Sequence, residues 1–184
     1  MSYCGLRIVA VAPVLVALVA AVAMADEPKA GDGLVEFKSD EGKFSVRLPG
    51  KPEEEVVEVG AAKEKQHQFK IGSEHGMYLV SYQDNPNLKG ASSKKIEAAL
   101  EGGRDGAVGV FHGKLIESKS VTLDKKHPGL IFRVTIPDAN GEARCRFYMV
   151  GTRLYQIMAI GEPDFANSEE ASQVIESFKT AAGG

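Results

Sequence analysis

The sequence predicts an α+β domain in which an antiparallel β-sheet is covered by helices. Three observations support this fold class. Apolar and polar residues alternate in several short segments, and glycine-containing turns join the last of these segments directly. Apolar residues at helical spacing occur in one central and one C-terminal segment. This order of strands, helix, strands and helix is typical of a sheet with helices packed on its faces.

The first strands are expected between residues 44 and 83. Phe44, Val46 and Leu48 alternate with polar residues, which predicts a half-buried strand that ends at Pro49-Gly50. Residues 56–71 are charged and are predicted to form one or two edge strands. Residues 77–83 predict a firmer strand, which stops at Asp84-Asn85-Pro86.

Two helices are predicted. The first covers about 93–104, with a serine available as its cap and the Gly102-Gly103 pair weakening its end. The second follows Asn167, which with Glu170 resembles an N-terminal capping pattern. Its apolar stripe should hold one face of the sheet and consists of Ala171, Val174, Ile175 and Phe178.

Four strands are predicted in the second half of the chain, over residues 114–123, 129–136, 143–150 and 153–161. The turns between them are expected at 127–129, 138–141 and 151–152, because Asn-Gly and a leading glycine suit the positive φ of two-residue hairpins. The last three strands should therefore form an antiparallel meander. Strands 143–150 and 153–160 are partly apolar on both sides, which predicts a sheet covered on both faces.

The N-terminal segment is predicted to be a signal peptide covering residues 1–25. Arg7 precedes an apolar run, and Ala23-Met24-Ala25 fits a signal-peptidase site. The alternative is a permanent anchor helix, which Pro13 inside the apolar run disfavours. Cleavage predicts a secreted or periplasmic protein that touches the membrane only before cleavage. A flexible lead-in (26–33), a single α+β domain (34–180) and a short tail (181–184) are expected to follow.

Net charge argues against a nucleic-acid-binding protein, and the cysteine content argues against a disulfide-stabilised one. Loss of Arg7 from the 22 basic residues leaves an acidic excess against 25 Asp and Glu, so a nucleic-acid partner is not expected. The mature chain would retain Cys145 alone, which rules out an intramolecular disulfide. Cys145 alternates onto the side of Phe147 and Met149 and is predicted to be a buried, inert thiol.

Several segments together resemble a family of exported bacterial proteins of unassigned function with a PsbP-like α/β/α sandwich. Their order and spacing carry the resemblance, which spans nearly the whole mature chain. The resemblance implies a fold and a non-catalytic role, and it supplies no active-site residues, because fold does not fix function. The segments are GKFSVRLPGKP (42–52), YLVSYQDNP (78–86), LEGGRDGAV (100–108), PGLIFRV (128–134), RFYMVGTRLYQIMAIG (146–161) and ASQVIESFK (171–179).

No motif predicts catalysis, a metal or another cofactor. The four histidines lack metal-ligand spacing, and the chain has no nucleophile elbow and no phosphate-binding loop. Asp138, Asn140 and Glu142 superficially resemble a calcium loop, but the ligand spacing is missing and a turn is the preferred interpretation. The chain is therefore not expected to be an enzyme.

One candidate binding surface remains. If Gly151-Thr152 is a two-residue turn, the strands before and after it place a basic and aromatic row on one side of the sheet. Arginine forks bind carboxylates and phosphates, so this row predicts a site for an anion. The alternative is that the arginines pair with glutamates of a covering helix or cover the core with their stems. The row consists of Arg144, Arg146, Tyr148, Arg153 and Tyr155.

The predicted function is an exported, non-catalytic binding or accessory module of the cell envelope. Its expected partner is an unknown envelope protein or a small anionic ligand. Two alternatives remain, namely a hydrolase whose active site is dispersed along the sequence, and a purely structural or stress protein.

Overall fold

A computed structural model describes residues 33–60 and 63–181. The predicted signal peptide (1–25), the predicted lead-in except Gly33, and the predicted tail except Ala181 lie outside these ranges. The described residues form one compact unit.

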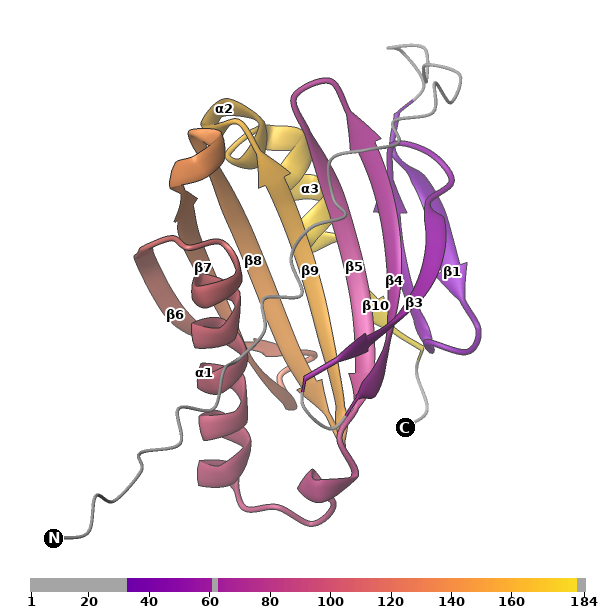
Figure 1. Ribbon diagram of the computed structural model, residues 1–184. Helices are drawn as coiled ribbons and strands as arrows, with labels where there is room; N and C mark the ends of the chain where they lie inside the picture. The colour runs from indigo at the N-terminus through magenta and orange to yellow at the C-terminus, as the bar shows by residue number, and fades with distance from the viewer. Residues whose placement is uncertain (1–32, 61–62, 182–184) are drawn as a thin grey trace, which may run out of the picture. The chain divides into compact units, whose positions relative to one another are not determined.

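A seven-stranded sheet with only antiparallel pairs forms the centre of this unit (Figure 1). Two meanders build it, and β5 pairs with β9 to join them. The predicted meander of the last three strands is confirmed, and it extends to β6. In spatial order the strands are β3 (Glu53–Val59), β4 (Glu64–Ser73), β5 (Gly76–Asp84), β9 (Arg153–Gly161), β8 (Gly141–Val150), β7 (His127–Ile136) and β6 (Leu115–Leu123).

A second sheet of three strands was not predicted. Its middle strand β2 (Phe44–Leu48) is the strand that the alternation indicated, with Phe44, Val46 and Leu48 buried. β1 (Val35–Ser39) and β10 (Lys179–Thr180) pair with either side of β2. β1 has only two alternating apolar residues, Val35 and Phe37, and β10 has only two residues, so both patterns are too short to predict a strand.

The helices differ from the prediction at their ends. α1 (Ser93–Val110) continues past Gly102-Gly103, because residues on both sides of this pair pack on the sheet. α3 (Glu169–Glu176) is capped by Ser168, whose hydroxyl accepts from the Ala171 amide, and not by Asn167. The other helices are α2 (Pro163–Ala166) and the 3₁₀ turns η1 (Pro86–Leu88) and η2 (Pro137–Ala139).

No helix in the described ranges has both the length and the hydrophobicity needed to cross a bilayer.

Two of the three predicted turns in the second half of the chain are displaced. Residues 127–129 belong to β7, and the preceding turn uses Asp124 and Lys125, both with positive φ. Pro128 is tolerated because it lies where β7 pairs with β6 but not yet with β8. β7 and β8 are joined by residues 137–140, one residue earlier than the predicted turn at 138–141, because Gly141 already belongs to β8. The turn at Gly151 is confirmed, since Gly151 has φ +62° and Val150 faces Arg153.

The sheet is covered on both faces, as predicted. One face packs against α1 and buries Cys145, Phe147 and Met149 together, in agreement with the predicted alternation. The other face packs against α3 and the small sheet (Figure 1). Phe178, which was expected on the last helix, follows it and is buried on this second face, where it stacks on Phe44.

Candidate anion-binding groove

The register of β8 and β9 places the five predicted binding residues on one side of the sheet. Tyr148 faces Tyr155, and Arg146 faces Ile157, as the turn at Gly151 requires. This side packs against α3 and the small sheet. The five side chains nevertheless have three different environments.

The two tyrosines belong to the core. Tyr148 is 4% exposed and stacks on Phe178, while Tyr155 is 3% exposed and donates its hydroxyl to the Gly42 carbonyl at 2.7 Å. Burial raises the pKa of both hydroxyls. Neither ring is presented to a ligand in solution, so the aromatic part of the predicted row stabilises the fold.

Arg153 on β9 links the turn between β1 and β2 to the main sheet through hydrogen bonds. Its Nε and Nη2 donate to the two carboxylate oxygens of Asp84 at 2.8 and 2.7 Å, and its Nη1 donates to the Glu41 carbonyl at 2.9 Å. The guanidinium also lies over the Tyr82 ring, 4.5 Å from its centroid. The bidentate bond to Asp84 raises the pKa of Arg153, and the same bond lowers the pKa of Asp84. Arg153 is therefore engaged structurally.

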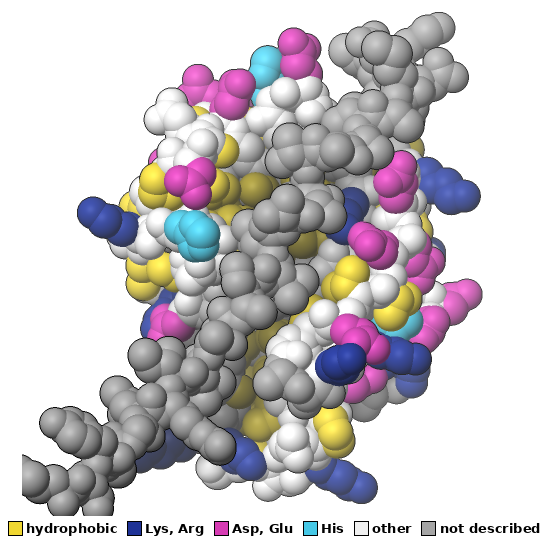
Figure 2. All heavy atoms as spheres, in the orientation of Figure 1, with side chains coloured by type: hydrophobic (Ala, Val, Ile, Leu, Met, Phe, Trp, Pro, Cys, Tyr) yellow, Lys and Arg dark blue, Asp and Glu magenta, His cyan; other side chains and the backbone are white. Residues whose placement is uncertain are grey.

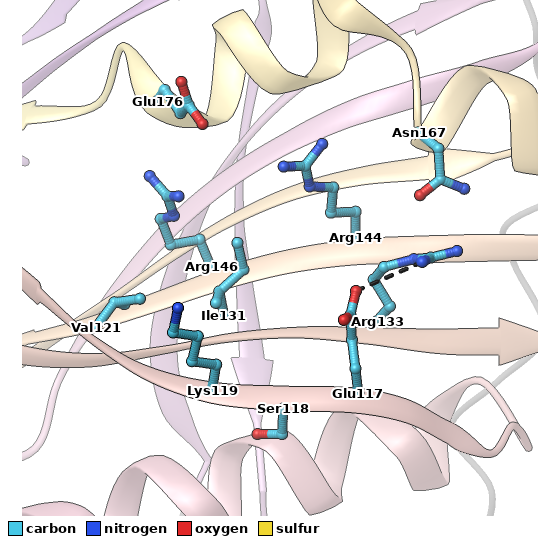
Figure 3. A pocket seen from close by; sticks show the side chains of 10 residues that line it. All are labelled: Glu117, Ser118, Lys119, Val121, Ile131, Arg133, Arg144, Arg146, Asn167 and Glu176. Carbon is cyan, nitrogen blue, oxygen red and sulfur yellow. Dashed lines mark hydrogen bonds and ion pairs between the residues drawn. The ribbon is translucent and has the colours of Figure 1, made fainter.

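Arg144 and Arg146 line a groove of about 490 Å³ (Figure 3). Strands β6, β7 and β8 form its floor, and α3 contributes Glu176 from the opposite side. We call it the basic groove, because four of its residues are cationic and two are acidic. It is lined by Glu117, Ser118, Lys119, Val121, Ile131, Arg133, Arg144, Arg146, Asn167 and Glu176.

Cross-strand pairing explains why these side chains gather. Lys119 faces Ile131, which in turn faces Arg146, so two cations flank an apolar residue. One step along the sheet, Arg133 lies between Glu117 and Arg144. Side chains directly opposite on one face of neighbouring strands are in reach of one another. Lys119 and Arg133 are not among the predicted binding residues, because their position depends on where the β6–β7 turn lies.

One cation of the groove, Arg133, is paired with carboxylates of the protein. Arg133 Nη2 donates to Glu142 at 2.6 Å, and its Nη1 donates to Glu117 at 3.4 Å. Asn167 adds a second donor to Glu142 at 2.9 Å. These bonds raise the pKa of Arg133 and lower the pKa of Glu142, in each case chiefly through the bond between the two. Arg133 is thus neutralised inside the protein.

The other three cations are not neutralised in this way. In residues 33–60 and 63–181, Lys119, Arg144 and Arg146 have no carboxylate within 4.0 Å. Arg144 Nη1 donates to the Ser172 hydroxyl at 2.6 Å. The Nε atoms of Arg146 and Arg133 are both buried without an acceptor from the described part of the chain, but only Arg133 has carboxylates beside its other nitrogens. Figure 3 shows the Arg144 and Arg146 guanidinium groups directed from β8 toward α3.

The groove is suited to holding an anion. Cationic donors flank the apolar side chains Ile131 and Val121, so a ligand could combine an anionic group with a small apolar part.

Cys145 lies on the opposite face of the sheet, where burial raises the pKa of its thiol. Within the described ranges, no group of three or more His, Cys, Asp and Glu side chains could hold a metal ion. On the visible part of the α1 side, by contrast, basic and acidic side chains are interspersed (Figure 2).

Neither known family models nor curated protein sequences match this chain. Among solved structures, the chain is similar to cyanobacterial PsbP (CyanoP) from Synechocystis sp. PCC 6803. The TM-score is 0.51 at 13% sequence identity, and the match covers 80% of this chain and 92% of CyanoP. A protein from Bacteroides thetaiotaomicron VPI-5482 aligns with a TM-score of 0.37 at 12% identity, over 80% of this chain and 48% of that one.

The match to CyanoP includes nearly all of that protein, and at this identity it concerns the fold alone. It agrees with an antiparallel sheet that has helices on both faces. The predicted α+β sandwich is confirmed, and the chain has the PsbP-like fold.

Proposed function

We propose that this protein is an exported, non-catalytic binding module of the cell envelope that holds an anionic group in the basic groove. The anion belongs to a small ligand or to an envelope partner. One observation carries the proposal. Three cations, Lys119, Arg144 and Arg146, line one groove without a carboxylate partner in the described ranges, and Arg146 has a buried donor without an acceptor.

The buried Nε of Arg146 is energetically unfavourable without an acceptor. A buried polar group without a partner costs about 1–3 kcal/mol, and a bound anion that accepts from it offsets this cost. Charge-assisted bonds from guanidinium to carboxylate or phosphate are among the stronger hydrogen bonds in proteins. Arg146 is therefore expected to contribute most to the affinity, with Arg144 and Lys119 adding charge.

The neighbouring hydroxyl supports binding in preference to catalysis. Ser172 donates to the Ser168 carbonyl at 3.0 Å and accepts from Arg144 at 2.6 Å. A serine nucleophile needs a base that takes its proton, whereas the hydroxyl of Ser172 donates its proton to a backbone carbonyl. In this arrangement Ser172 positions Arg144.

The experiment is a titration of the purified protein with inorganic phosphate and with succinate, followed by NMR. Sodium chloride at the same ionic strength is the reference, because non-specific attraction is screened by salt. Resonances of β6, β7, β8 and α3 should shift, and Arg146→Gln should weaken binding by about tenfold or more, the loss for one charge-assisted bond. Arg146→Lys should restore part of the affinity.

Lys94→Gln is the matched control, because it removes one exposed positive charge from α1 on the other face of the sheet. It should bind both anions as the wild type does. Equal affinity of wild type and Arg146→Gln, with unchanged urea midpoints, would contradict the proposed site.

A further inference from the structure

Strand β6 is the outer strand of the main sheet, beside the basic groove. In the described part of the chain it pairs with β7 alone, and Leu115 to Ser120 are all exposed. An outer strand presents a row of backbone donors and acceptors to which another strand can pair. Such an edge is a candidate for association when its side chains also match those of a partner.

The side chains of β6 are complementary to themselves. Glu117 and Lys119 lie on the groove face on either side of Ser118, which faces the α1 side and accepts from Arg104 at 3.5 Å. In an antiparallel pair of two β6 strands centred on Ser118, Glu117 of each copy lies directly opposite Lys119 of the other. A two-fold axis repeats this opposite-charge pair, so a single contact contributes two ion pairs.

Neighbouring registers are disfavoured. A shift of the pairing by one residue places Ser118 opposite Lys119 or Glu117 of the other copy, so both ion pairs are lost. Two more possibilities, pairs centred on Lys119 or on Glu117, set like charges opposite each other on the two-fold axis. Such repulsion in the alternatives is how charge patterns select one register. The strand therefore specifies the centre at Ser118.

The local backbone is compatible with this pairing. The register of β6 with β7 is regular from Glu117 to Leu123 and shifts only between Leu115 and Glu117. The apolar Leu115 and Ile116 are 41% and 44% exposed at the start of the strand. In the pair centred on Ser118, Ile116 lies opposite Ser120 of the second copy, so part of this apolar surface leaves water.

The strand at the opposite edge of the sheet, β3, is not complementary to itself in charge. β3 carries glutamates at positions 53, 54, 55 and 58, so antiparallel pairing of two β3 strands brings carboxylates close together. We infer that the protein forms a two-fold symmetric dimer through β6, with Glu117 of each copy bound to Lys119 of the other. This contact shares Lys119 with the proposed anion site, but it does not require a bound anion, and Arg144 and Arg146 remain directed toward α3.

Charge reversal tests the inference. Glu117→Lys sets two lysines opposite Lys119 side chains, and Lys119→Glu sets two glutamates opposite Glu117. Each variant alone should raise the dimer Kd by at least about tenfold, since two attractive pairs become repulsive. An equimolar mixture of the two variants should dimerise again. One copy then has lysine at both positions and the other has glutamate at both, so each opposing pair is attractive.

Sedimentation velocity over a concentration series from micromolar to roughly 1 mM measures the association. Lys94→Glu, a charge reversal on α1, is the control and should dimerise as the wild type does. Both edge residues are exposed, and urea midpoints verify that each variant is folded. The inference is overturned if the wild type stays monomeric throughout, if either variant alone dimerises like the wild type, or if the mixture stays monomeric.

Discussion

At the scale of single residues, Glu142 links Arg133 of the basic groove to α2. It accepts from Arg133 at 2.6 Å and from Asn167, which follows α2, at 2.9 Å. Its side chain is 18% exposed, so solvent screens these bonds only in part. The bond to Arg133 is the main reason why its pKa lies below the ordinary value of 4.5.

This pKa shift predicts a particular dependence of stability on pH. The unfolded chain binds the proton more readily than the folded one, so the contribution of Glu142 is complete above about pH 4.5 and is lost as the pH falls through the lowered value. Glu142→Gln should cost about 1–3 kcal/mol at pH 7 and should flatten the acid limb of the stability curve. Urea unfolding between pH 3 and 7 gives both quantities.

Glu101→Gln, an exposed glutamate of α1, serves as the control and should keep the acid limb of the wild type. An equally steep acid limb in Glu142→Gln would assign the acid sensitivity to other carboxylates.

Only part of the groove can be predicted from the sequence. The turn at Gly151 specified that Arg144 and Arg146 share a side with Tyr148, and this geometry is confirmed. The turn does not determine whether Tyr148 is buried or accessible. Its burial depends on Phe178 and the small sheet, which come from distant parts of the chain. The same holds for Arg153, whose acceptor Asp84 lies on β5.

At the scale of elements, Gly129 shows how β7 and β8 are fitted together. A Cβ at this position would lie 2.4 Å from the Phe147 carbonyl oxygen and 2.5 Å from Cδ1 of the Tyr148 ring. The ring of Tyr148 therefore lies over a strand position that has room for hydrogen alone. This packing also explains why a glycine is needed inside a buried strand.

Gly129→Ala should destabilise the protein by about 1–3 kcal/mol, because the backbone oxygen cannot move without disturbing the ladder. The matched change Gly72→Ala on β4 meets no atom within 4 Å and should be neutral or slightly stabilising. Denaturant midpoints of the two variants provide the comparison, and equal midpoints would contradict the tight approach of Tyr148.

Elements with a clear apolar pattern between turn residues were predicted best. β2 alternates, whereas β5, β8 and β9 are largely apolar runs, and the positions of all four agree with the prediction within one or two residues. β1 and β10 owe their existence to pairing with β2, which is a property of the folded chain. α1 passes through two glycines because packing against β7 and β8 outweighs their low helix propensity.

At the scale of the whole molecule, the proposed export makes a prediction about mass. The segment ending in Ala23-Met24-Ala25 should be removed after Ala25 when the protein is exported. The intact mass of the protein recovered from the envelope fraction measures this directly. A mass that retains residues 8–24 would indicate an anchored protein instead.

The two faces of the main sheet also divide the chemical groups by which the molecule can be observed. All four tyrosines of the described ranges, Tyr78, Tyr82, Tyr148 and Tyr155, pack on the side of α3, whereas Cys145 packs on the side of α1. The chain has no tryptophan, so the ultraviolet absorbance and fluorescence of the described ranges report almost entirely on one half of the core. Thiol labelling reports on the other half, and the two signals together can resolve the order in which the layers separate during unfolding.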